Sequence, residues 1–151
     1  MTTAVIDQYM RAALVEAQEA FEQGEVPVGA VVVLNGKIVG QGHNQRERLA
    51  DPTAHAEILA LRQAAQACGS WRLSGADMYV TLEPCTMCAG AIVLARVRRL
   101  FFGADDPKAG AVVSLFRILD DNRLNHTVEV FKGVLEDECS GMLSRFFATK
   151  R

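Results

Sequence analysis

The sequence predicts an α/β fold with a five-stranded mixed sheet, and three observations support this prediction. Segments typical of strands and of helices alternate along most of the chain, as they do when helices cover both faces of a sheet. Asn35-Gly36 separates the first two strand-like segments, which is the strongest short signal for an antiparallel hairpin. The chain has 151 residues, enough for a single domain over 1–151 with a substantial core. We therefore expect an N-terminal antiparallel hairpin within a mostly parallel sheet.

The N-terminal half begins with a helix and then the hairpin. Between residues 7 and 23, apolar side chains recur every three or four positions, which predicts a helix buried along one face that ends at Gly24. Residues 28–34 form a continuous apolar run rich in valine, which is typical of a strand covered on both faces. The hairpin pairs this strand with a second one at 37–42. After a polar loop, the next helix is expected at 54–67.

The C-terminal half continues the alternation. A third strand is expected at 78–82, and Pro84, whose fixed φ suits the first helical position, predicts a helix over 85–95. A fourth strand is expected at 97–102. The remaining segments are, in order, a loop at 103–110, a short helical segment at 112–119, a fifth strand at 128–132 and a closing helix at 136–148.

Charge and hydropathy narrow the classes of protein. The formal net charge of −2 argues mildly against a protein that coats nucleic acid. Two local basic groups remain, and either could be solvated surface charge or could contact RNA: Arg96, Arg98 and Arg99, and then Arg145, Lys150 and Arg151. No apolar run approaches the ~20 residues of a membrane helix, and the N-terminus has no secretory pattern. We therefore expect a cytoplasmic protein without a membrane partner, whose cysteines stay reduced and are available to a metal.

Three residues have the character and spacing of zinc ligands. They are His55 and a Cys-x-x-Cys pair, Cys85 and Cys88. Three ligands are one short of a closed structural site, whereas a catalytic zinc keeps its fourth position for water. Glu57, two residues from His55, could move the protons of that water. The simpler alternative for Glu57 is an ordinary first-turn residue favoured by the helix dipole.

The spacing also predicts where these side chains meet. Residues two apart, such as His55 and Glu57, do not share a helix face, so they can converge only at a helix end. Cys85 and Cys88, three apart, do share a face. If both helices start at one edge of the sheet, their N-termini meet over one ion, outside the carboxyl ends of the strands. Cys68 and Cys139 are expected to be buried small hydrophobic residues and not a fourth ligand.

The motifs resemble those of a known enzyme family. His55-Ala56-Glu57 with Pro84-Cys85-Thr86-Met87-Cys88 matches the general signature of zinc-dependent nucleobase deaminases. Further blocks across nearly the whole chain are similar to the bacterial tRNA-specific adenosine deaminases: Glu25 to Ala30, Asp51 to Ala54, Thr81 to Glu83, Phe102 to Ala104 with Asp106, Lys108 and Gly110, and Leu124 to His126. The blocks around Pro27 and Asp106 are more discriminating than the zinc motif, which all these deaminases share.

The resemblance implies a three-layer α/β/α, cytidine-deaminase-like fold and a homodimer whose active sites draw on both subunits. The implied reaction is hydrolytic deamination of the wobble adenosine of a tRNA anticodon loop to inosine, with one Zn²⁺ per chain. His55, Cys85 and Cys88 would bind the zinc, and Glu57 would transfer protons. The implied substrate contacts are Asn44 with the target nucleotide, Pro27, Val28, Gly29 and Leu82 with the base, and Asp106 with a neighbouring sugar.

Other readings of these residues stay open. The protein could deaminate a free base or nucleoside, such as guanine, cytosine or cytidine, or it could be a non-catalytic zinc-stabilised module with a fourth protein ligand. Asn44 and Asp106 could serve only to form turns. Structural roles are expected for Glu83, His43 and His126, and for Phe146 and Phe147, although one of these phenylalanines could stack on an anticodon base.

Overall fold

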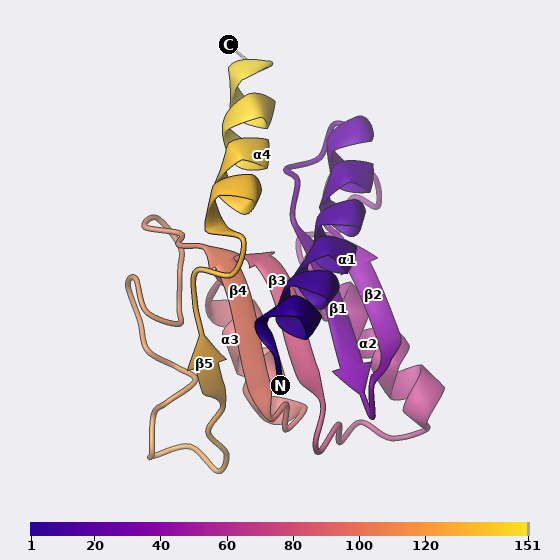
Figure 1. Ribbon diagram of the computed structural model, residues 1–151, viewed down its shortest axis with the longest axis vertical. Coiled ribbons are helices and arrows are strands. Elements are labelled where there is room, and N and C mark those ends of the chain that lie inside the picture. The colour runs from indigo at the N-terminus through magenta and orange to yellow at the C-terminus, as the bar shows by residue number, and fades with distance from the viewer. Residues whose placement is uncertain (151) are drawn as a thin grey trace.

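The computed structural model of the protein describes residues 1–150, which contain a five-stranded sheet with helices on both faces (Figure 1). The strands are β1 (Gly29–Leu34), β2 (Lys37–His43), β3 (Asp77–Leu82), β4 (Arg99–Ala104) and β5 (Glu129–Phe131). The helices are α1 (Thr3–Glu22), α2 (Ala56–Cys68), α3 (Thr86–Leu94) and α4 (Glu136–Ala148). Across the sheet the strands follow the order β2-β1-β3-β4-β5, which confirms the predicted mixed α/β fold.

The sheet is half parallel. β1 is antiparallel to both β2 and β3, whereas the pairs β3-β4 and β4-β5 are parallel. Asn35 and Gly36 both have positive φ, 52° and 75°, as a tight hairpin turn requires, so the hairpin prediction is confirmed. The expectation of a mostly parallel sheet was wrong, because α2 carries the chain from β2 past β1. β3 therefore pairs with the edge of β1 that faces away from β2, and it is antiparallel to β1.

Each face of the sheet has its own hydrophobic core. α1 and α4 pack on one face, over Val31, Tyr79 and Phe101, and α2 and α3 pack on the other. The rings of Tyr79 and Phe101 are stacked with centroids 4.4 Å apart. In Figure 1, α1 crosses the near face of the sheet, α2 and α3 lie behind it, and α4 extends beyond the carboxyl end of β4. These are the three layers that the sequence predicts.

Two glycines allow helices to approach strands closely. A Cβ atom at Gly29 would lie 2.0 Å from the carbonyl oxygen of Ala13 in α1, and one at Gly40 would lie 2.2 Å from that of Ala60 in α2. Real Cβ atoms do not come so close to backbone oxygens. The absence of a side chain at these positions therefore sets the distance between the layers.

Several element boundaries differ from expectation. α1 begins at Thr3, because the Thr2 hydroxyl accepts a hydrogen bond from the Val5 amide at 3.3 Å and caps the helix. α2 begins at Ala56, two residues later than predicted. The expected helical segment at 112–119 is wrong, since this segment is a series of turns held by hydrogen bonds to the buried Glu83. Among residues 1–150, none of the helices combines the length and apolarity that crossing a bilayer requires.

Candidate active site

The N-termini of α2 and α3 bring His55, Cys85 and Cys88 together. His55 and Cys85 are the N-cap residues of the two helices, with extended backbone, and Cys88 lies in the first turn of α3. The His55 Nδ1 atom lies 3.6 Å from the Cys85 Sγ and 3.5 Å from the Cys88 Sγ. The cluster therefore has the arrangement that the spacing predicted, with two helix ends converging beside the carboxyl end of β3.

These distances fit a tetrahedral zinc ion. With Zn–N near ~2.05 Å and Zn–S near ~2.3 Å, a tetrahedral angle separates nitrogen and sulfur ligands by about 3.6 Å. The Nδ1–Sγ distances of 3.6 and 3.5 Å match this value, and all three ligand atoms lie within 4.8 Å of one another. Two thiolates and an imidazole are also the donor set that zinc prefers. The described residues thus form a candidate metal site with three protein ligands.

The hydrogen bonds within the cluster shift the pKa values of all three side chains. A hydrogen bond with Cys88, followed by one with His55, lowers the pKa of Cys85 to about 3. The hydrogen bond with Cys85 raises the pKa of His55. The hydrogen bond with Cys85 and burial together raise the pKa of Cys88, so this thiol keeps its proton beside the Cys85 thiolate. Zinc binds thiolates and a neutral imidazole, so its binding would displace the protons that the raised pKa values keep on His55 and Cys88.

Glu57 lies beside this cluster in the first turn of α2, and only 4% of its surface is exposed. Burial, the largest effect, raises its pKa to about 7. A first-turn glutamate with only a helix-dipole role would be solvated and acidic. A carboxyl group with a pKa near neutrality can instead take up and release protons at the pH where the enzyme works.

A cavity of about 490 Å³ opens over His55, Glu57 and Cys85. This volume is in the range of small-ligand sites. Four of the predicted substrate-binding residues line it: Val28, Asn44, Leu82 and Asp106. Phe147, for which stacking on an anticodon base was the alternative to a structural role, also lines the cavity. Other lining residues come from distant segments and were not among the predicted substrate contacts: Arg46, Asp105, Lys108 and Leu143.

Asn44 and Asp106 both form turns and line the cavity. The side-chain Nδ2 of Asn44 donates to the Val26 carbonyl at 3.2 Å, and its Oδ1 accepts from the backbone amide of Arg46 at 3.2 Å. One oxygen of Asp106 accepts from the amides of Lys108 and Ala109 at 3.1 and 3.2 Å. The two readings of these residues are therefore compatible, because the same side chains shape the loops that form the cavity wall.

Comparison with known proteins supports an enzymatic reading of this site. A model of the MafB19-like deaminase family matches residues 6–150. The chain is 54% identical over 143 residues to the tRNA-specific adenosine deaminase of Bacillus subtilis (strain 168), covering 95% of this chain and 89% of that protein. It is 51% identical to the enzyme of the same name from Agrobacterium fabrum, covering 95% of this chain and 94% of that protein.

The chain belongs to the tRNA-specific adenosine deaminase family. A solved structure from a study of A-to-I editing by tRNA:A34 deaminases at the wobble position of transfer RNA superimposes with a TM-score of 0.86 and 50% identity, covering 89% of this chain and 98% of that one. A guanine deaminase from Nitrosomonas europaea has a TM-score of 0.82 at 22% identity, covering 94% of this chain and 84% of that one. This second likeness shows only that the two proteins share the fold.

In this tRNA-specific adenosine deaminase, two of the predicted base-contacting residues lie outside the set that lines the cavity. Neither Pro27 nor Gly29 is among the lining residues. Gly29 packs against α1, and its amide donates to the Thr81 hydroxyl at 3.1 Å. Of the turn from 27 to 29, only Val28 lines the cavity, and a substrate role for the other two stays a prediction.

Glu83 organises the loop that forms one wall of the deaminase's cavity. Its buried carboxylate accepts hydrogen bonds from the amides of Asp106, Val112, Val113 and Ser114, and from the Ser114 hydroxyl. Burial by itself raises the pKa of Glu83, but the hydrogen bonds from Ser114 and the loop amides outweigh it and lower the pKa to about 2. The structural role expected for Glu83 is thus visible, although nothing in its sequence surroundings identifies these distant partners.

The remaining cysteines of the deaminase are not ligands in this cluster. Cys139 is buried, as expected, and its Sγ lies 3.8 Å from the Val134 carbonyl. Cys68 is exposed at the end of α2, so the expectation that it is buried was wrong. The apolar periodicity of the helix does not reach its last residue, which therefore faces solvent.

Proposed function

We propose that the protein hydrolyses the wobble adenosine of a tRNA anticodon loop to inosine and releases ammonia. The observation that carries the proposal is the three-ligand cluster of His55, Cys85 and Cys88 beside the buried Glu57, in a cavity sized for a nucleoside. Support for adenosine in tRNA as the substrate comes from the 50–54% identity to proteins named for that activity.

The residues divide the chemistry between them. When bound by His55, Cys85 and Cys88, Zn²⁺ supplies a Lewis acid that makes water nucleophilic at neutral pH. Glu57 accepts a proton from the attacking water and delivers it to a ring nitrogen of the adenine. Glu57 then takes the second proton of that water from the oxygen now bonded to the ring carbon and gives it to the exocyclic amine, which leaves as ammonia while the carbonyl group of inosine forms. Its pKa of about 7 suits one carboxyl group for both the base and the acid step.

The rest of the cavity recognises the nucleotide. Val28 and Leu82 supply apolar walls for the flipped-out base, and the Asn44 amide holds the nucleotide. The Asp106 carboxylate accepts a hydrogen bond from a ribose 2′-hydroxyl, which favours RNA over DNA. Arg46 and Lys108 are suited to phosphate contacts, and the half-exposed Phe147 offers a ring on which a neighbouring base can stack.

We also propose that the enzyme is a homodimer with α3 at the interface. α3 is a short apolar helix, and 68% of the Leu94 surface at its end is exposed in the single chain. The dimer itself is implied by the resemblance to the family, and the apolar composition of α3 makes this helix the candidate interface. The single domain over 1–151 and the cytoplasmic location remain predictions from the sequence.

The decisive experiment compares substrates. The zinc-loaded protein is incubated with a tRNA anticodon stem-loop carrying adenosine at the wobble position, with the DNA version of that hairpin, and with free adenosine, cytidine and guanine. We expect inosine in the RNA hairpin and little turnover of the others. Turnover of a free base without inosine in the hairpin would replace this proposal with a nucleobase deaminase. Elemental analysis that finds no bound zinc, or spectroscopy of the metal that finds a fourth protein ligand, would remove the water that the proposal uses as the nucleophile.

A further inference from the structure

A second cavity lies at the opposite edge of the sheet from the candidate active site. It has a volume of about 370 Å³, and its lining residues come from three segments, at the amino-terminal ends of β3, β4 and β5. They are Arg72, Ser74, Gly75, Arg96, Arg98, His126 and Thr127, which we call the basic pocket. No acidic residue is among them, although the whole chain has a net charge of −2.

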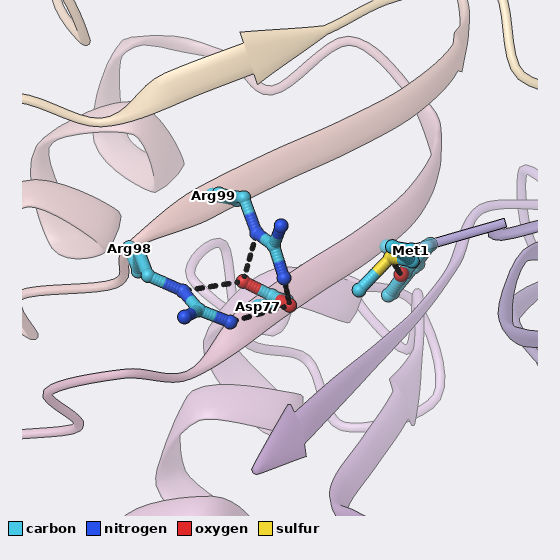
Figure 2. A network of polar contacts seen from close by, with 5 residues as sticks. Met1, Asp77, Arg98 and Arg99 are labelled. Atoms are coloured by element: carbon cyan, nitrogen blue, oxygen red, sulfur yellow. Dashed lines mark hydrogen bonds and ion pairs between the residues drawn. The ribbon is translucent and has the colours of Figure 1, made fainter. Parts of the chain in front are cut away.

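The positive charge of the basic pocket is not neutralised by its neighbours. Arg98 donates to Asp77 at 3.3 and 3.2 Å, but Arg99 holds the same carboxylate more tightly, at 2.9 and 2.6 Å (Figure 2). One buried carboxylate thus faces two guanidinium groups. Within residues 1–150, no carboxylate lies within ion-pair distance of Arg72 or Arg96.

The pocket is also built in advance of any ligand. The Leu73 amide donates to the Ala95 carbonyl and the Arg98 amide to the Ala76 carbonyl, each at 2.8 Å, which ties two of the three segments together. The ring nitrogen Nε2 of His126 lies 2.7 Å from the Val97 carbonyl and joins the third segment to them. A preformed site loses less conformational entropy when it binds.

Arg96 is held in an uncommon conformation. Its φ is +66°, a left-handed value that glycine adopts readily and a long side chain does not. Its guanidinium donates to the Val93 carbonyl at 3.0 Å and lies 5.8 Å from the centroid of the Trp71 ring. Arg96 follows the C-cap of α3, where a left-handed residue closes the helix: its amide donates to the Val93 carbonyl at 3.0 Å, and the Val97 amide donates to the Ile92 carbonyl at 3.3 Å. The end of the helix therefore accounts for this conformation and fixes the position from which the Arg96 side chain extends.

An exposed aromatic ring adjoins the charges. Trp71 is 62% exposed, and the Arg72 guanidinium lies 5.1 Å from its ring centroid. Guanidinium forks match the oxygens of a phosphate, while indole and guanidinium planes both stack on unpaired bases. A basic pocket in which Arg72 and Arg96 lack a carboxylate partner among the described residues, beside an exposed tryptophan, therefore has the chemistry of an RNA-backbone site more than that of a simple anion site.

We propose that the basic pocket binds a backbone phosphate of the tRNA, with Trp71 beside it contacting a base or sugar. The proposal rests on the proposed function only for the identity of the RNA. The six residues of β3, at ~3.3 Å each, separate the two cavities by about 20 Å, which is shorter than the stem and loop of a tRNA arm. An RNA arm that places its wobble base in the candidate active site is therefore long enough to reach the basic pocket.

The chain offers a direct probe, because Trp71 is its only tryptophan. The zinc-loaded full-length protein is titrated with an anticodon stem-loop that already carries inosine, so no turnover occurs, and separately with inorganic phosphate. Tryptophan emission and filter binding are both recorded over a range of salt concentrations. The test variant is Arg72→Gln with Arg96→Gly, where glycine keeps the left-handed backbone. The matched control is Arg11→Gln, which removes an exposed arginine on α1.

We expect RNA to change the emission of the wild-type protein. The double variant should bind about tenfold more weakly, with a salt slope lower by about one to two, while Arg11→Gln behaves as wild type. Equal RNA affinity and salt slope in the double variant and wild type would overturn the proposal. So would an emission change that inorganic phosphate saturates at the same concentration as the RNA. Arg72→Gln alone, at an exposed position, provides the same comparison if the double variant does not fold.

These outcomes are separable from those of the substrate assay, because they measure binding and not turnover. A protein that makes no inosine but binds RNA through Arg72 and Arg96 would support this inference and contradict the proposed function. If the wild type forms inosine but the double variant binds RNA as tightly as the wild type, the proposed function is supported and this inference is contradicted.

Discussion

At the scale of single residues, two buried glutamates have opposite tasks, and their surroundings explain the difference. Glu57 has few compensating hydrogen bonds, so burial dominates and its pKa rises to about 7. Glu83 accepts hydrogen bonds from four backbone amides and a hydroxyl, so its pKa falls to about 2. The first can exchange protons at neutral pH, whereas the second stays ionised and holds a loop.

Replacing Glu57 with glutamine should abolish proton transfer and leave the fold intact. The amide has the same shape but cannot carry the proton, so we expect kcat on the stem-loop RNA to fall by at least about 10²-fold. Zinc content, measured by elemental analysis, should equal that of the wild type, because Glu57 is not one of the three candidate ligands. Retained turnover in Glu57→Gln would show that another group moves the proton.

Replacing Glu83 with glutamine should make the free energy of unfolding less dependent on pH in the acidic range. The folded-state pKa of Glu83 is about 2, below its ordinary 4.5, so its contribution is complete above pH ~4.5 and is lost as the pH falls towards 2. A shift of this size corresponds to about 3 kcal/mol. Urea unfolding of wild type and Glu83→Gln should therefore differ at pH 6, and the difference should shrink near pH 2.5. A constant difference across this range would contradict the assignment.

At the scale of elements, contacts between layers depend on missing side chains. α1 lies against β1 at Gly29, and α2 lies against β2 at Gly40. In both places the neighbouring atoms belong to helix backbone, which cannot rotate away as a side chain can. The positions of α1 and α2, and hence of His55 and Glu57 at the start of α2, are set by these contacts.

Gly29→Ala should therefore destabilise the protein far more than an ordinary glycine substitution does. Its Cβ would meet the Ala13 carbonyl at 2.0 Å and the Ala17 amide nitrogen at 2.4 Å, so α1 must shift, at a cost of at least about 2 kcal/mol. Gly141→Ala in α4 is the matched control, since the nearest atom to its Cβ would be a flexible arginine tip at 3.5 Å. Alanine there should stabilise the helix by about 0.5–1 kcal/mol.

Thermal and urea unfolding of the two variants would check this prediction. Similar stabilities for Gly29→Ala and Gly141→Ala would mean that the packing of α1 on β1 is loose enough to absorb a methyl group.

At the scale of the whole molecule, the two cavities occupy opposite edges of the sheet. The candidate active site lies beyond the carboxyl ends of β3 and β4, where side chains from helix ends and loops converge. The basic pocket lies beyond their amino ends. The exposed end of α3, the proposed dimer interface, adjoins the basic pocket, since the Arg96 guanidinium donates to the Leu94 carbonyl at 3.4 Å.

The dimer can be tested with a pair of charge substitutions. Leu94→Glu would place a carboxylate in the proposed interface and should raise the dimer dissociation constant by at least about tenfold, because a buried unpaired charge is costly. Val15→Glu, at a similarly exposed position on α1, should have no effect. Sedimentation equilibrium at micromolar concentration gives both values. A wild-type mass equal to one chain, or equal effects of the two variants, would contradict the proposed interface.

The sequence by itself determined the local features of this protein. The hairpin follows from two residues. The candidate metal ligands and Glu57 follow from spacings of two and three residues, because the ends of α2 and α3 bring side chains at these spacings together. The succession of strands and helices follows from apolar periodicity. Each of these depends on interactions within a few positions of the chain.

Only the tertiary structure decided the features that depend on distant partners. The predicted helix at 112–119 is absent because amides of that segment bond to Glu83, about thirty positions earlier. β3 is antiparallel to β1 because α2 carries the chain from β2 across β1 before β3 begins. The rim of the active-site cavity and the basic pocket both join segments remote in sequence. Such contacts form only when the whole chain packs, so no local pattern of residues can encode them.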